Sequence, residues 1–200
     1  DKLAIFVDDM RRMGLSCLAP DINRSEAEFG VEQDGEGLAV RYALAALKGV
    51  GEKAMEQLIA ERDASGPFAS LDDFAGRVDP KLLNKRQLES LIAGGAFDGL
   101  SPDRATTYAV AETVLAVAAQ AADARTSGQG GLFGAGPASV AAIRMPRDVH
   151  WSLADSMAQE KEAFGFYFSA HPVDRYRHLA DANGARSYGA ICDQPPVVEA

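Results

Sequence analysis

The feature that most constrains this chain is a short turn, Leu47-Lys48-Gly49-Val50-Gly51, between two helix-forming runs. One run covers 42–46 before the turn, and the other covers 52–59 after it. Glycine adopts positive φ at little cost, so the two glycines would allow the chain to reverse within very few residues. Leu47 and Val50 are expected to turn inward and hold the two helices together. The pattern predicts a helix-hairpin-helix over residues 43–62.

A hairpin of this kind can hold a nucleic-acid backbone without reading its sequence. The hairpin amides and the start of the second helix would point to one spot, and helix N-termini attract phosphate oxygens. Lysines at positions 48 and 53 add positive charge beside that spot. The candidate DNA-binding residues of the first hairpin are therefore Lys48, Gly49, Val50, Gly51 and Lys53.

Other glycine-rich turns were weighed for this stretch. Gly49 to Ala54 matches the dinucleotide pattern G-x-G-x-x-G/A. That pattern should follow a buried β-strand, whereas the alanines and leucines here favour a helix. A P-loop is excluded, because the turn holds no Gly-Lys step followed by Ser or Thr. A C-cap glycine in an ordinary helical pair remains the structural alternative.

A second pair of helices is expected to pack on the first. Ser70-Leu71-Asp72-Asp73 has the form of a capping box that opens a helix over 70–78. Asn84-Lys85-Arg86-Gln87 does the same for a helix over 84–93, which Gly94-Gly95 ends. Two such hairpins would bury each other's apolar faces, which predicts a tandem helix-hairpin-helix unit.

A basic cluster lies near the second turn and consists of Lys81, Lys85 and Arg86. Lys85 and Arg86 are therefore further candidate DNA-binding residues. The alternative is a solvated surface that binds nothing, because groups of charged residues are commonly just that.

The rest of the chain predicts a mainly α fold with few strands. Residues 1–13 carry apolar side chains at helical spacing, and 28–42 have the pattern of a small β-hairpin with an Asp-Gly turn. Residues 103–125 are Ala-rich, which predicts one helix about 30 Å long on the surface of the protein. Gly, Ser and Ala dominate 126–142, a composition typical of a flexible linker.

A Leu-Phe pair stands in this linker, within Gln129-Gly130-Gly131-Leu132-Phe133. Exposed apolar residues in a linker need a partner's pocket, and Gln-x-x-Leu-Phe is the form of the short peptide that docks on bacterial sliding clamps. Gln129, Leu132 and Phe133 are therefore the candidate clamp-binding residues. Such a pattern arises by chance in roughly 4% of chains of this length. Chance, or folding of the pair back onto its own domain, stays open.

The overall charge limits which kind of nucleic-acid binder this chain can be. The net charge is -9, which excludes a stand-alone, strongly basic binder, so any DNA contact must be local. Cys17 and Cys192 have no metal-ligand spacing, and the composition fits the reducing cytoplasm. No apolar run approaches the ~18–20 residues that span a bilayer, so no membrane contact is expected.

No set of side chains in this sequence predicts catalysis, a cofactor or a metal site. His171 has no nucleophile or carboxylate cluster at a useful spacing and is expected to be a structural turn residue. Asp8-Asp9 and Asp72-Asp73 are neighbours on helices, where adjacent side chains point to different sides.

Taken together, the segments from Asp1 to Arg186 resemble the catalytic alpha subunits of bacterial DNA polymerase III, the C-family replicative polymerases. The ordered set is more specific than any single motif. The segments that carry the resemblance are Gly14-Leu15, 20–25, 46–51, 66–68, 71–74, 83–86, 88–92, 95–98, 160–162, 165–167 and His171-Pro172.

The resemblance implies a division of the chain and a set of partners. The parts would be the end of a fingers domain (1–27), the tandem helix-hairpin-helix unit (28–104), a long helix (105–125), a flexible linker with the clamp-binding peptide (126–146), a helical connector (147–184) and the start of an OB-type β-barrel (185–200). The partners would be duplex DNA, the sliding clamp and other subunits of the polymerase III holoenzyme.

The resemblance also implies where catalysis belongs. The parent activity would be nucleotidyl transfer with two divalent metals, Mg²⁺, held by aspartates of a palm domain that precedes Asp1. Because those aspartates are expected upstream of Asp1, this chain would be inert by itself. Both ends of the chain also look like cuts within a longer polypeptide. Three hypotheses follow: a processivity segment of a replicative polymerase, the same region of an error-prone relative, and a structural connector without DNA contact.

Overall fold

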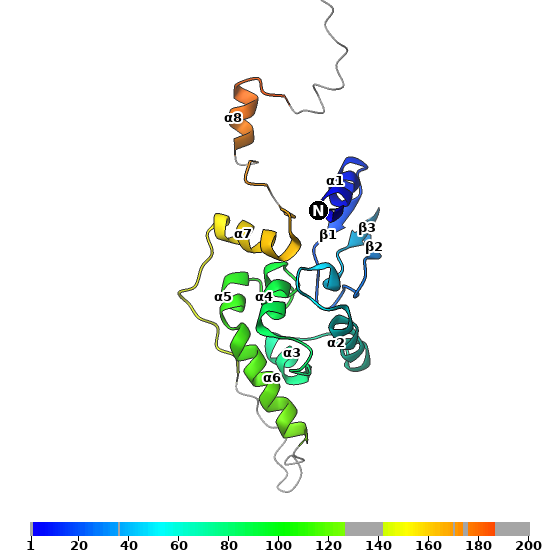
Figure 1. Ribbon diagram of the computed structural model, residues 1–200, viewed down its shortest axis with the longest axis vertical. Coiled ribbons are helices and arrows are strands. Elements are labelled where there is room, and N and C mark those ends of the chain that lie inside the picture. The colour runs from blue at the N-terminus through cyan, green and yellow to red at the C-terminus, as the bar shows by residue number, and fades with distance from the viewer. Residues whose placement is uncertain (1, 36, 127–141, 170, 174–175, 187–200) are drawn as a thin grey trace, which may run out of the picture. The chain divides into compact units, whose positions relative to one another are not determined.

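The computed structural model describes residues 2–35, 37–126, 142–169, 171–173 and 176–186. Helices dominate these residues, so the expected mainly α class is confirmed (Figure 1). Residues up to Phe168 form one compact unit, and the residues from Ser169 belong to a second. The described elements are α1 (Lys2–Arg12), β1 (Ser16–Leu18), β2 (Gly30–Asp34), β3 (Gly37–Arg41), the 3₁₀ turn η1 (Leu44–Ala46), α2 (Glu52–Ser65), α3 (Leu71–Arg77), α4 (Lys85–Ala93), α5 (Arg104–Ala109), α6 (Ala111–Thr126), α7 (Leu153–Phe164) and α8 (Arg177–Ala182).

The helix α1 is the one predicted over 1–13. It ends at Gly14, whose φ of +74° lies in the left-handed region that favours glycine. The amide of Leu15 then returns to the carbonyl of Met10 at 2.9 Å, which closes the helix end.

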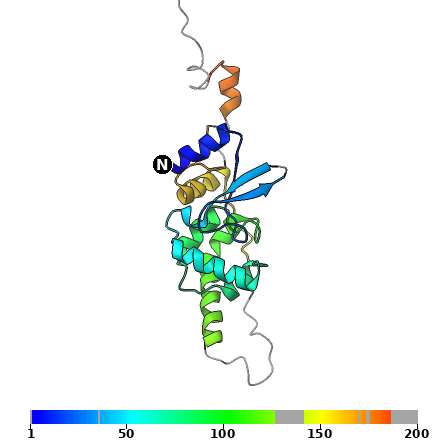
Figure 2. The same ribbon diagram turned by 90° about the vertical axis from the view of Figure 1, so that its right-hand side faces the viewer.

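The predicted β-hairpin forms, and a third strand joins it. β2 and β3 pair antiparallel with Val31 opposite Val40, and Gly35 takes a φ of +60° in the turn. β1 pairs in parallel with β3, so the strand order in the described residues is β1-β3-β2. Figure 2 shows the hairpin projecting from the helices of the first unit. β1 was not predicted, because three residues without apolar alternation carry no strand signal of their own.

The first helix of the first hairpin was wrongly predicted, because 42–46 forms only the single 3₁₀ turn η1. The chain is extended at Ala43 (φ -68°, ψ 139°) before the turn and again at Leu47 (φ -70°, ψ 142°) after it. The amide of Leu44 bonds to the carbonyl of Glu26 at 3.0 Å. This bond ties the turn to the preceding loop, and too few residues remain before Leu47 for an α-helix.

The two helical pairs share one apolar core, as predicted. Phe74 of α3 contacts Phe68 and Phe97 edge to face, with ring centroids 5.1 and 4.9 Å apart. The core extends from the first hairpin into α4, and its fully buried side chains include Leu44, Leu47, Met55, Leu58, Leu88, Leu91 and Ile92.

Side chains cap both helices of the second pair. The Asn84 side chain accepts from the Gln87 amide at 3.0 Å, and the Gln87 side chain accepts from the Asn84 amide at 3.0 Å, which confirms that capping box. Ser70 accepts from the Asp73 amide at 3.0 Å. The Asp73 carboxylate accepts from the amide of Ala69 rather than Ser70, so the other predicted box is displaced by one residue.

The single long helix predicted over 103–125 is wrong, because the chain breaks at Val110 into α5 and α6. Val110 has φ -98° and ψ 7°, outside the helical region. The hydroxyls of Thr106 and Thr107 donate to the carbonyl of Asp103 at 3.1 and 2.7 Å. Bonds of this kind compete with the helix backbone and bend helices.

The segment lies on the surface of the first unit, as its thin apolar stripe predicts, because one face of α6 packs against α3 and the other is exposed. Its stripe is thin but entirely made of small side chains, which allow two helix axes to approach closely. The buried residues of α6 are Ala111, Val114, Val117, Ala118 and Ala121.

Tyr42 is the centre of an aromatic cluster that joins the first hairpin to α7. Its ring contacts Phe164 and Phe168 with centroids 4.8 and 5.6 Å away, and Phe29 lies at 4.9 Å. The Tyr42 hydroxyl is buried and has no hydrogen-bond partner among the described residues. Burial raises the pKa of this phenol to about 12.

The second unit contains α8 and a turn around His171. The amide of Val173 donates to Nδ1 of His171 at 3.2 Å, which confirms the predicted turn role of this histidine.

We predict that Tyr42→Phe raises the free energy of unfolding by about 1 kcal/mol, because it removes a buried hydroxyl without a partner. Between pH 10 and pH 12 the native protein should lose stability, since the unfolded tyrosine releases its proton first, and the variant should lose less stability over the same range. Urea unfolding at neutral pH measures the gain in stability, and urea unfolding at pH 10 and pH 12 measures the loss. Tyr108→Phe is the control, because Tyr108 bonds to Glu89 and gains nothing from losing its hydroxyl. A less stable Tyr42→Phe at neutral pH would contradict the prediction.

Candidate nucleic-acid interface

The hairpin loop reverses at Gly49 alone. Gly49 has φ +77°, whereas Gly51 has φ -88° and ψ 132°, so the expectation that both glycines use positive φ is wrong for Gly51. The Val50 amide bonds to the Leu47 carbonyl at 3.2 Å, which closes the turn. Leu47 and Val50 are buried as expected, with 2% and 9% exposure, and Gly49 faces solvent.

The N-terminus of α2 is open to an anion. The first amides of a helix have no partner inside it, and no described side chain caps α2, whose N-cap is Gly51. Four other helices of the unit have a side-chain cap: Ser70 caps α3, Asn84 caps α4, Asp103 caps α5 and Ser152 caps α7. The uncapped amides lie next to the exposed Gly49, and the first turn of α2 carries one anion, Glu52, and one cation, Lys53, both exposed.

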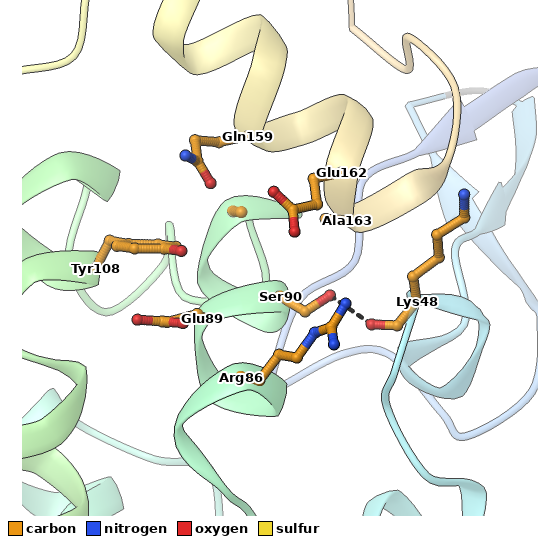
Figure 3. A pocket seen from close by; sticks show the side chains of 9 residues that line it. Lys48, Arg86, Glu89, Ser90, Tyr108, Gln159, Glu162 and Ala163 are labelled. Atoms are coloured by element: carbon orange, nitrogen blue, oxygen red, sulfur yellow. Dashed lines mark hydrogen bonds between the residues drawn. The ribbon is translucent and has the colours of Figure 1, made fainter.

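Both main-chain groups of Lys48 are already bonded. Its amide donates to the carbonyl of Ala163 in α7 at 2.7 Å, and its carbonyl accepts from the Ser90 hydroxyl at 2.9 Å (Figure 3). The expectation that all hairpin amides point to one phosphate is therefore wrong for Lys48. Its side chain is exposed and extends away from the loop (Figure 3).

The two basic residues predicted for the second hairpin differ in their ion pairing among the described residues. Lys85 forms ion pairs with two carboxylates, and its Nζ lies 2.8 Å from Glu112 and 3.8 Å from Glu89. The hydrogen bond that Lys85 donates to Glu112 raises the pKa of Lys85. Arg86 has no ion-pair partner among the described residues, and the same holds for Lys48 and Lys53.

Lys48 and Arg86 come together at one hollow between the first hairpin, α4 and α7. The hollow has a volume of about 210 Å³, and Figure 3 shows the side chains around it. Two cations and two carboxylates line it, together with polar and aromatic groups: Lys48, Arg86, Glu89, Ser90, Ala93, Tyr108, Gln159, Glu162 and Ala163. Lys53 does not line it. The cations therefore form one side of a surface whose other side is acidic.

The candidate clamp-binding residues Gln129, Leu132 and Phe133 lie outside the described residues. The residues on either side of 127–141 are described, and both contact α3. The Arg125 guanidinium donates to the Gly76 carbonyl, and the Ile143 amide donates to the Asp72 carboxylate at 2.7 Å.

Sequence reasoning missed the residues that fix the hairpin loop from outside, chiefly Ser90 and Ala163. Ser90 is one polar residue on α4, and the Ala163 contact uses only a main-chain carbonyl. No local pattern marks either contact.

The comparison with known families agrees with this geometry. The sequence model of the helix-hairpin-helix motif matches residues 14–107, so this part of the chain is a helix-hairpin-helix domain.

Known relatives narrow the family further. The chain is 43% identical over 174 residues, 87% of its length, to the DNA polymerase III subunit alpha of Caulobacter vibrioides. It is 40% identical over 176 residues to that of Neisseria meningitidis serogroup B, and 40% identical over 184 residues to that of Thermus aquaticus. The chain belongs to the family of DNA polymerase III alpha subunits. It spans about 15% of the length of these relatives.

The described ranges hold neither a cluster of metal ligands nor a membrane-spanning helix. No three His, Cys, Asp or Glu side chains there come together as ligands for a metal ion, so the Mg²⁺ implied for the family has no fitting site in them. None of the helices in those ranges combines the length and apolarity that crossing a bilayer requires.

Proposed function

We propose that this chain is the part of a cytoplasmic, replicative DNA-directed DNA polymerase that holds duplex DNA by its backbone. The observation that carries the proposal is the uncapped N-terminus of α2 beside the exposed Gly49 loop. Helix N-termini bind phosphate through their free amides and the helix dipole. Template-directed nucleotidyl transfer belongs to the whole subunit, and its metal-binding aspartates would lie in another part of that polypeptide.

Three side chains supply the charge for this grip. Lys48, Lys53 and Arg86 are exposed and have no ion-pair partner among the described residues. A few local cations on a chain of net charge -9 give weak binding that does not depend on base sequence and falls steeply with salt. Such a grip suits an enzyme that must move along its product.

The sliding clamp is the proposed second partner, through Gln129, Leu132 and Phe133. A peptide and a backbone grip, each weak, raise one another's effective concentration when one chain carries both. The combination would keep the polymerase on DNA and so support processive synthesis by the polymerase III holoenzyme. The relatives are all named as DNA polymerase III alpha subunits, which favours the replicative enzyme over an error-prone relative.

Gly51→Ser tests the helix N-terminus directly. A serine at this extended N-cap has room, since the nearest atom to an added Cβ is 3.8 Å away, and its hydroxyl would occupy an α2 amide. We expect the free energy of unfolding to rise by about 1 kcal/mol, while affinity for a duplex falls about fivefold. Chemical unfolding and fluorescence anisotropy measure the two changes. If stability rises and DNA affinity stays unchanged, the hairpin is only a structural turn.

Lys48→Ala with Lys53→Ala tests the charge. Loss of two phosphate contacts should weaken duplex binding about tenfold at 100 mM salt and make the plot of log K against log salt less steep by about 2. Anisotropy over a salt series measures both. Lys2→Ala with Arg12→Ala on α1 is the control with the same charge change, and it should bind like the native chain. Equal losses in both double variants would mean that only net charge matters.

The clamp partner is tested by pull-down. The native chain should retain the sliding clamp, and Gln129→Ala with Leu132→Ala and Phe133→Ala should lose at least nine-tenths of it, because the apolar anchors are removed. Ser139→Ala with Val140→Ala changes the same stretch outside the pentapeptide and should retain the clamp. Retention by the triple variant would refute this partner site.

A further inference from the structure

We infer that α7 and Ser90 are positioning elements of the hairpin loop, so that the proposed phosphate site is built by three parts of the chain and not by the helix-hairpin-helix motif alone. The inference rests on the proposed function, because it concerns the same site. It assigns a role to the 153–164 helix, which sequence reasoning treated as a connector.

The first support is the pair of bonds on Lys48, the residue just before Gly49. The Ala163 carbonyl takes the Lys48 amide at 2.7 Å, and the Ser90 hydroxyl donates to the Lys48 carbonyl at 2.9 Å. The peptide groups on both sides of Lys48 are thereby fixed in orientation. Because the next residue makes the reversal, the direction of the Gly49 and Gly51 amides depends on these two bonds.

The second support is that the end of α7 is itself packed into the core. Ala163 and Phe164 are buried, and Phe164 stacks on Phe168 with centroids 4.5 Å apart while its edge meets Tyr42. Gly165 ends the helix at φ +86°. The last carbonyls of a helix lack partners inside it, and the Lys48 amide satisfies that of Ala163. The hairpin loop and α7 therefore complete each other.

The third support is the tight contact on the other side of the loop. An added Cβ at Gly94 would lie 2.9 and 3.0 Å from the two methyl carbons of Leu47. Leu47 is thus pressed against the backbone that follows α4. Ser90 stands one turn earlier on the same helix, so α4 holds the loop by packing and by a hydrogen bond.

A loop held in this way binds an anion without first being ordered. Fixing a binding loop in its bound conformation increases affinity by removing the entropy loss on binding. Loss of a residue that positions the loop should therefore affect DNA binding differently from loss of a charged residue. Ser90 carries no charge, so its loss should lower affinity and leave the salt dependence unchanged, whereas loss of a lysine changes both.

The test compares the native 200-residue chain, Ser90→Ala, Ser90→Thr and the control Ser65→Ala, which changes an exposed serine at the end of α2. Duplex affinity is measured over a salt series, well below the midpoint of thermal unfolding of each variant. Ser90→Ala should bind about threefold to tenfold more weakly with the native salt slope, and Ser90→Thr should recover most of the loss. Ser65→Ala should match the native chain.

Amide hydrogen exchange supplies a readout without DNA. The Lys48 amide should exchange much more slowly than that of Gly49 in the native chain, and Ser90→Ala should reduce the difference. Native-like affinity of Ser90→Ala, or a Lys48 amide that exchanges as fast as Gly49, would overturn the inference while native DNA binding still supports the proposed function. If the native chain binds no duplex, the proposed function fails and this inference fails with it.

Discussion

The contact between Leu47 and the backbone at Gly94 is the constraint on which the rest of the arrangement depends. Leu47 is 2% exposed, and its methyl groups occupy the space that any side chain at position 94 would need. The loop that faces solvent is therefore seated on the end of the second helical pair. The two hairpins therefore share one core. The conformation of the exposed Gly49 is set by the buried side chains on either side of it.

Some basic side chains form ion pairs within the fold, and others are exposed and without an ion-pair partner among the described residues. This division explains how an acidic chain could still bind DNA locally. Most cations near the core hold elements together, as in the pairs Arg41–Glu32, Arg62–Glu26, Arg77–Glu61, Arg104–Asp98 and Lys85–Glu112. Lys48, Lys53 and Arg86 remain without such a partner among the described residues. Binding to a polyanion depends on local, unpaired cations more than on net charge, since nearby ions screen distant charges.

The sequence predicted those features that a few neighbouring residues decide. The reversal at Gly49, the Asn84 capping box and the β2–β3 hairpin all follow from local propensity or hydrogen bonding. The misses required information from elsewhere in the chain. Strand β1 exists only because β3 lies beside it. In the site, Ser90 and the Ala163 carbonyl reach Lys48 across the fold, so no spacing reveals them. Gly51 was predicted for the wrong physical reason. It does not supply a positive φ as Gly49 does, but it leaves the start of α2 without a side-chain cap.

The contacts of Arg125 and Ile143, which flank the proposed clamp peptide in the sequence, have a mechanical consequence. Arg125 donates to the Gly76 carbonyl and Ile143 donates to the Asp72 carboxylate, so both contacts are made with one short helix, α3. A force applied to Arg125 or Ile143 would be transmitted to α3 and to α6, which packs against α3. It would not be transmitted directly to the Gly49 loop. Under the proposed function, a force exerted through the clamp would reach α3 and α6 and would not act directly on the loop that holds the DNA backbone.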